Sequence, residues 1–153
     1  MLKRALCLLA LFWLVMPAAA SAQEFNLDAA GLALRGYDPV AYFTAGKPEA
    51  GRGEFTATHK GATYRFVSAA NRDAFTAAPD RYLPQYGGWC AFAAAAGKKA
   101  DGDPQVWRIE NGKLYLNYNR SIGQRWSADI PGYVARADAK WPEIREKSAS
   151  DLK

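Results

Sequence analysis

The sequence has few of the residues that bind metals or form disulfides. It contains two cysteines, two methionines and one histidine in 153 residues. Both methionines and Cys7 fall within residues 1–22. Without that segment, Cys90 is the only cysteine and His59 the only histidine. This inventory excludes an intramolecular disulfide and a methionine-rich copper carrier. It also excludes a closed zinc site, which needs more ligands than a Cys–His pair supplies.

The first 22 residues are typical of a secretory signal peptide. Lys3 and Arg4 form a positive segment, residues 5–15 form an apolar core, and residues 20–22 (Ala-Ser-Ala) are typical of a cleavage site. The apolar run is shorter than the roughly 20 residues that a membrane span needs. We therefore expect export to the periplasm, and no membrane attachment of the 131 residues that remain once 22 of 153 are removed.

The sequence has no long run of basic residues. The net charge of the full chain is +5, and it falls to +3 when Lys3 and Arg4 leave. The remaining basic residues are scattered and match no nucleic-acid motif. We therefore expect a monomer of one compact domain with no nucleic-acid partner.

Alternating apolar residues and turn dipeptides predict a small α+β domain with two antiparallel β-hairpins and several short flanking helices. One hairpin joins residues 54–59 to residues 62–67 across Lys60-Gly61. The other joins residues 106–110 to residues 113–117 across Asn-Gly, the preferred dipeptide for a tight hairpin.

Capping residues and prolines predict where helices begin and end. Asp38 before Pro39 is suited to cap a short helix, and Ser68 is suited to cap a helix over residues 69–77. Asn71 and Asp103 are interpreted as helix or turn residues. Further helices are expected over residues 79–82, 89–96 and, with interruptions near Pro131-Gly132 and Pro142, 121–146.

Cys90 is the main candidate site residue. We predict it in or just before the first turn of a helix, where partial positive charge and free N–H groups lower a thiol pKa. The alternative is a buried, inert cysteine, since free cysteine is among the most buried residue types. A lone cysteine in an oxidising compartment indicates an intermolecular partner or a reactive thiol. We therefore favour a functional Cys90.

Other residues near Cys90 in the sequence are expected to complete the site. His59 is a second ligand or a base on one interpretation, and a solvated turn residue on the other. Aromatic side chains shield the thiol, although packing alone would also explain them. Paired glycines let backbone N–H groups approach an anion or a metal-bound thiolate. The residues expected to line the site are Tyr82, Tyr86, Gly87, Gly88 and Trp89.

Several segments together resemble the YHS-domain family, and most closely its exported single-domain group. They are Asp38-Pro39-Val40, the hairpin from His59 to Phe66, Ser68, Asn71, Phe75, the segments 79–82 and 86–91, Gly97-Lys98, Asp103-Pro104 and the run 111–117. The match covers residues 34–120. Together with the signal peptide (1–22), this match predicts a lead-in (23–33), a YHS-like domain (34–120), a helical extension packed on it (121–146) and a polar tail (147–153).

The resemblance implies a domain related to metal-binding modules. However, this chain has Ala41, Val67 and Asn71 where the metal-binding members place cysteines, so their usual site is absent. Exported members that resemble this chain can carry selenocysteine at the position of Cys90. The resemblance therefore points to redox or soft-metal chemistry at this atom.

Three functions compete for Cys90. The first is binding of a soft metal, best copper(I), through Cys90, with His59 as the candidate second ligand, because thiolates select soft ions. The second is thiol redox chemistry at Cys90 with a partner protein or a small thiol, since the chain has no resolving cysteine. The third, a minor alternative, is a Cys–His hydrolase with Gln85 as oxyanion donor. We expect a copper-binding accessory module and not a conventional enzyme.

Overall fold

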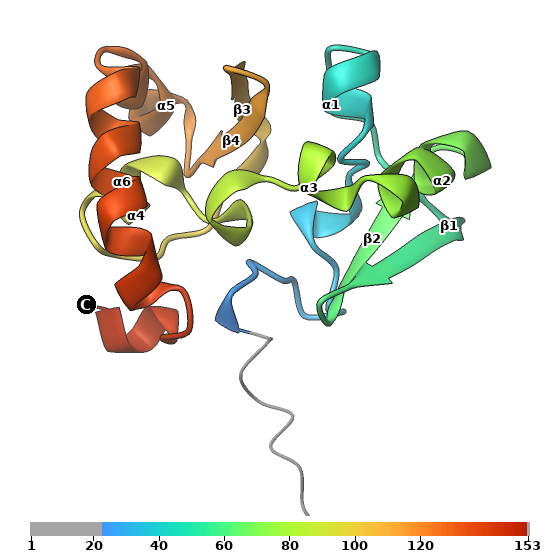
Figure 1. Ribbon diagram of the computed structural model, residues 1–153, viewed down its shortest axis with the longest axis horizontal. Coiled ribbons are helices and arrows are strands. Elements are labelled where there is room, and N and C mark those ends of the chain that lie inside the picture. The colour runs from blue at the N-terminus through green and yellow to red at the C-terminus, as the bar shows by residue number, and fades with distance from the viewer. Residues whose placement is uncertain (1–22, 153) are drawn as a thin grey trace, which may run out of the picture.

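Two β-hairpins form separate antiparallel sheets at the two sides of the molecule (Figure 1). The first pairs β1 (Arg52–His59) with β2 (Ala62–Phe66), and the second pairs β3 (Asp103–Glu110) with β4 (Lys113–Asn117). The structure is a computed structural model that describes residues 23–152, so the predicted signal peptide lies outside it. The predicted α+β fold with two hairpins is confirmed.

Both hairpins turn at a dipeptide in the left-handed region of backbone space. Asn111 has φ 50° and Gly112 has φ 73°, and the Lys60-Gly61 turn has the same signs. Two-residue turns of this kind match the right-handed twist of the strands that they join. Glu110 consequently pairs with Lys113, as the sequence predicted.

Short helices flank the hairpins, and their bounds are close to the predicted ones. The structure contains α1 (Ala41–Thr44), α2 (Ala69–Ala77), α3 (Pro79–Tyr82), α4 (Ala91–Ala95), α5 (Arg120–Ser127) and α6 (Ile130–Ile144), with 3₁₀ turns at η2 (Leu34–Gly36), η3 (Gln85–Gly88) and η4 (Ala149–Leu152). Ser68 caps α2 by accepting from the Asn71 N–H at 3.2 Å. None of the helices in the described part of the chain is long and apolar enough to cross a membrane.

Two helix predictions need correction. The helix expected over residues 89–96 is α4, which begins only after Cys90 and ends at Ala95. In the C-terminal segment, Pro142 does not interrupt α6, because the helix ends two residues later and the missing N–H affects only its last turn. The break between α5 and α6 instead precedes Pro131, where Asp129 accepts from the Gly132 N–H at 3.0 Å.

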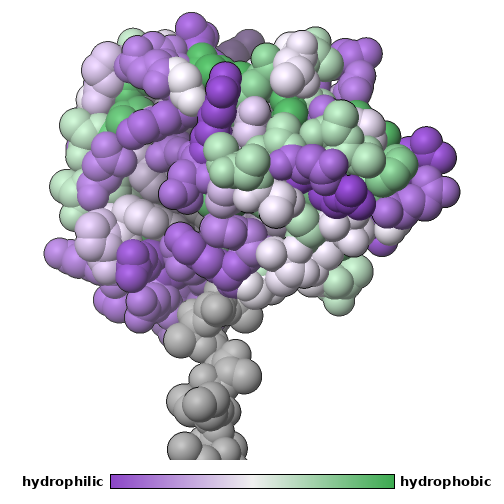
Figure 2. Space-filling model, turned by 45° about the vertical axis from the view of Figure 1, so that its right-hand side comes forward, coloured by the Kyte–Doolittle hydropathy of each residue, from purple (hydrophilic) through white to green (hydrophobic). Residues whose placement is uncertain are grey.

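The apolar side chains pack in three clusters. One lies between the first hairpin, α2 and α3, and contains Phe25, Ala33, Val40, Ala62, Tyr64, Phe66, Phe75 and Tyr82. A second lies between α4, α5, α6 and β4, and contains Tyr86, Ala91, Ala94, Ala95, Tyr115, Trp126, Ile130 and Ala137. A smaller one joins Leu34, Tyr42, Leu114 and Leu116. The face shown in Figure 2 is mainly hydrophilic, with hydrophobic residues in small groups.

Asp38 is a fully buried acidic residue that ties together the elements of the first half. Its Oδ1 accepts from the N–H groups of Val40 at 2.8 Å and Ala41 at 3.3 Å, where α1 begins. Its Oδ2 accepts from the Val67 N–H at 2.9 Å and from the Asn71 side-chain amide at 2.7 Å. One side chain thus joins α1, the end of β2 and α2.

Candidate functional site

Cys90 lies directly before α4, and only 1% of its surface is exposed. Its N–H donates to the Ala100 carbonyl at 2.9 Å, and its carbonyl accepts from the Ala94 N–H at 3.0 Å. Its backbone also bridges to Leu116 of β4. These contacts hold the residue between β4 and the loop that leads to β3.

The surroundings of the Cys90 sulfur raise the thiol pKa, whereas a lowered pKa was expected. Burial raises the pKa of the Cys90 thiol, while hydrogen bonds from the backbone N–H groups of Ala93, Tyr118 and Phe92 lower it by less. The position before a helix therefore supplies N–H donors as predicted. However, α4 has only five residues, and desolvation of the sulfur outweighs those donors. The prediction of a lowered thiol pKa is wrong.

Asn117 is the buried side chain that contacts the Cys90 thiol. It is the last residue of β4 and is 3% exposed. Its Oδ1 accepts from the Phe92 N–H at 3.2 Å and lies 3.6 Å from the Cys90 sulfur, within reach of the thiol proton. Because the amide oxygen is engaged by these donors, the group that Asn117 can offer elsewhere is its NH₂.

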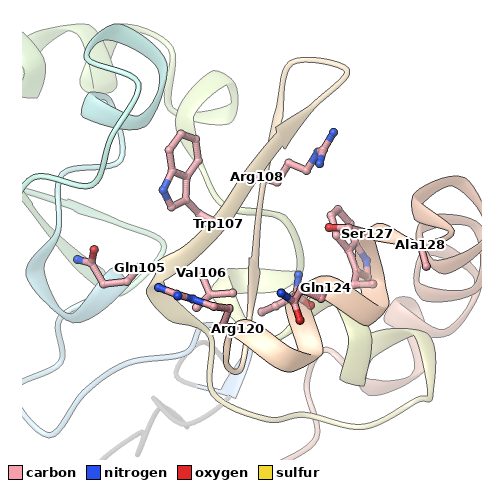
Figure 3. A pocket seen from close by; sticks show the side chains of 11 residues that line it. Gln105, Val106, Trp107, Arg108, Arg120, Gln124, Ser127 and Ala128 are labelled. Atoms are coloured by element: carbon pink, nitrogen blue, oxygen red, sulfur yellow. The ribbon is translucent and has the colours of Figure 1, made fainter.

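Asn117 also lines a cavity of about 530 Å³ between β3 and α5 (Figure 3). Gly123 brings α5 close to β3 at the cavity wall, since a Cβ there would lie 2.8 Å from Val106 Cγ1. The lining residues are Gln105, Val106, Trp107, Arg108, Asn117, Arg120, Gly123, Gln124, Trp126, Ser127 and Ala128. Sequence reasoning missed this cavity, because its residues come from elements that are separate in the chain.

His59 is not brought to Cys90. It ends β1, and its ring packs edge-on against Phe75 with centroids 6.1 Å apart. Its Nε2 is buried and has no hydrogen-bond partner within the part of the chain that the structure describes. Figure 1 shows β1 and β2 on one side of the molecule, and α4 and β4 on the other. The structure thus separates the two members of the expected Cys–His pair.

The aromatic residues around Cys90 in the sequence have structural contacts of their own. Tyr82 packs edge-on against Phe43, with centroids 5.5 Å apart. Tyr86 donates to Asp138 Oδ1 at 2.8 Å. Trp89 donates from Nε1 to the Glu24 carbonyl at 3.1 Å. Packing and hydrogen bonding to the N-terminal segment and α6 thus explain these residues without a ligand.

The paired glycines leave room for the backbone of the N-terminal segment. Gly87 has φ 60°, and a Cβ there would lie 2.0 Å from the Glu24 carbonyl oxygen, so only glycine fits. The Gly87 carbonyl accepts from the Asn26 N–H at 2.9 Å. Gly88 also has a positive φ, of 83°. The close approach expected at these glycines is therefore made by the protein's own backbone at Gly87.

The groups around the Cys90 sulfur do not form a copper(I) site by themselves. Within residues 23–152, no group of three or more His, Cys, Asp or Glu side chains is placed to hold a metal. Copper(I) prefers soft ligands, whereas the contacts of the Cys90 sulfur are an amide oxygen and backbone N–H groups. A second soft ligand would have to come from outside this part of the chain.

The residues that carry the family resemblance have structural roles in the first half of the protein. Asp38 and Asn71 form one hydrogen-bonded unit, and Phe75 is buried beside the first hairpin. Such roles fit a shared fold but assign no chemistry. Comparisons with protein families, curated proteins and solved structures find no match for the chain, so the resemblance to the YHS-domain family stays a prediction.

Proposed function

We propose that the protein is a thiol-dependent accessory module in which Cys90 exchanges with a small disulfide. One observation carries the proposal: Asn117 both contacts the Cys90 sulfur and lines the cavity between β3 and α5. A change of the Asn117 rotamer would connect the sulfur to that cavity. The proposal includes export to the periplasm, where disulfides persist, and membership of the YHS-domain family.

The exchange needs no second cysteine in the chain. The Cys90 thiolate attacks one sulfur of the disulfide, so that a new S–S bond forms as the old one breaks. The leaving sulfur departs as a thiolate and takes up a proton from water. The N–H groups of Phe92, Ala93 and Tyr118 stabilise the Cys90 thiolate before the attack. A second small thiol then releases Cys90 by the same exchange in reverse.

We expect native protein to form a mixed disulfide at Cys90 when it is incubated with glutathione disulfide. Because burial raises the thiol pKa, the rate should keep rising through pH 9, the ordinary value for the group. Asn117→Ala should react about tenfold faster or more, since the side chain that covers the sulfur is gone. Intact-mass spectrometry at timed intervals measures both rates.

Cys90→Ser is the control for the site of the adduct, and Tyr118→Ala is the control for truncation of a neighbouring, exposed side chain. Reaction of wild type and Asn117→Ala only in denaturant would show that Cys90 is an inert core residue. If native Asn117→Ala reacts no faster than native wild type, Asn117 is not the side chain that covers the sulfur.

Copper(I) binding at Cys90 is the second candidate. The three N–H groups that face the sulfur would stabilise a metal-bound thiolate as well as a free one. We expect reduced protein, given copper(I) with a soft co-ligand such as a small thiol, to retain about one ion, and Cys90→Ser to retain none. His59→Ala should bind like wild type, because His59 packs against Phe75 in the other half. Equal retention by wild type and Cys90→Ser would dismiss this candidate.

A further inference from the structure

We infer that the cavity between β3 and α5 binds a small organic carboxylate. Its volume of about 530 Å³ lies within the range of small-molecule sites, roughly 300–1,000 Å³. The inference goes beyond the proposed function, because it depends on the cavity lining and not on the thiol. Three features of that lining determine the class of ligand.

The first feature is charge of one sign. The eleven lining residues include Arg108 and Arg120 and no acidic residue. Arg108 is paired with Glu110 at 3.4 Å, whereas Arg120 takes part in no ion pair among residues 23–152. In Figure 3, Arg120 extends from α5 toward Gln105 and Val106 of β3. An exposed guanidinium at this place can hold a carboxylate through two parallel hydrogen bonds.

The second feature is an excess of hydrogen-bond donors at the inner wall. Trp126 is 1% exposed, and its Nε1–H has no hydrogen-bond partner among residues 23–152. A buried donor without an acceptor costs about 1–3 kcal/mol, so native proteins rarely keep one without a reason. Asn117 adds its NH₂ group, because its oxygen already accepts from Phe92 and contacts the Cys90 thiol. A ligand that carries only acceptor oxygens complements this wall.

The third feature is apolar surface beside the guanidinium. Val106, Ala128 and the buried edge of Trp126 line the cavity, and Tyr115 supports the Trp126 ring with centroids 5.3 Å apart. The Trp107 ring lies on the opposite face of β3, against Tyr42. This apolar surface favours an organic anion over inorganic phosphate.

Benzoate is a suitable probe. It is titrated by calorimetry and by tryptophan fluorescence up to about 10 mM, because ligands of this size have dissociation constants in that range. We expect saturable binding to wild type that Arg120→Gln weakens about tenfold, since the charge-assisted bonds are lost. Trp126→Phe, which keeps a ring and removes the N–H, should weaken binding severalfold. Arg125→Gln on the same helix, outside the lining, should bind like wild type.

Benzyl alcohol has the same ring without the charge and should bind at least tenfold more weakly than benzoate. Equal binding of benzoate to the Arg120 and Arg125 variants, equal binding of the alcohol, or binding of phosphate without benzoate would each overturn the inference. Benzoate binding without thiol exchange would refute only the proposed function.

Discussion

Replacing Asp38 with alanine is expected to lower the free energy of unfolding by about 3–5 kcal/mol, the largest loss that we predict for one residue. The Asp38 side chain is 0% exposed and accepts four hydrogen bonds. Alanine would leave the Val67 N–H and the Asn71 amide buried or half-buried without their acceptor. Domains of this size have a total stability of roughly 5–15 kcal/mol, so the variant would approach the limit of folding.

Asp38→Asn tests the two carboxylate oxygens separately, because it replaces one of them with an NH₂ group. The amide oxygen can still accept from Val40 and Ala41, but the NH₂ group would face two donors, Val67 N–H and the Asn71 amide. We expect most of the loss to persist. Adding Asn71→Asp to this variant should recover part of it, because an acceptor then faces the new NH₂ group.

Urea unfolding followed by circular dichroism gives the stability of each Asp38 variant. Asp73→Ala is the matched control, since Asp73 is exposed and, among residues 23–152, pairs only with the neighbouring Arg72. It should change stability by less than about 0.5 kcal/mol. A similarly small change for Asp38→Ala would contradict the role of Asp38 as the residue that joins α1, β2 and α2.

The hairpins and the capped helix could be predicted because their signals are local. Asn111-Gly112 sets the second turn through its own backbone angles, and Ser68 bonds to an N–H three residues away. Local signals do not say which charged residues become buried. Asp38 and Lys99 are buried because distant segments supply their partners, whereas most acidic residues and lysines stay exposed.

The candidate site was predictable only in part. The sequence places Cys90 before a helix, and the structure puts it there, but burial of the sulfur depends on β4 packing over it. His59 was paired with Cys90 because no other histidine is available, yet its position depends on Phe75 of α2. The cavity needs β3 and α5 together, so no linear motif could have indicated it.

Replacing Lys99 with methionine is expected to lower the free energy of unfolding by about 2–4 kcal/mol. Lys99 is 7% exposed, and its Nζ donates to three carbonyl oxygens, those of Gln23, Arg145 at 2.7 Å and Lys147 at 2.7 Å. The ammonium group thereby joins Gln23 to the end of α6. Methionine keeps the apolar stem but leaves all three carbonyls without this donor.

Two aromatic rings complete the surroundings of the ammonium group. Nζ lies 5.4 Å from the centroid of Trp89 and 5.5 Å from that of Trp141. Lys98, the preceding residue, is exposed, so Lys98→Met is the matched control and should change stability by less than about 0.5 kcal/mol. Equal stabilities of the two variants in urea would show that the contacts of Lys99 contribute nothing.

The Lys99 contribution should also depend on pH. Burial lowers the pKa of Lys99 from 10.5 to about 8, although the charge of Glu24 acts in the opposite direction. Between these two values the unfolded chain binds a proton that the folded chain has released, so stability rises with pH. The difference in stability between wild type and Lys99→Met should therefore be smallest below pH 8 and should grow toward pH 10. A difference that stays constant from pH 7 to pH 10 would contradict the lowered pKa, and it would mean that the carbonyls and rings compensate the ammonium group for the water it has lost.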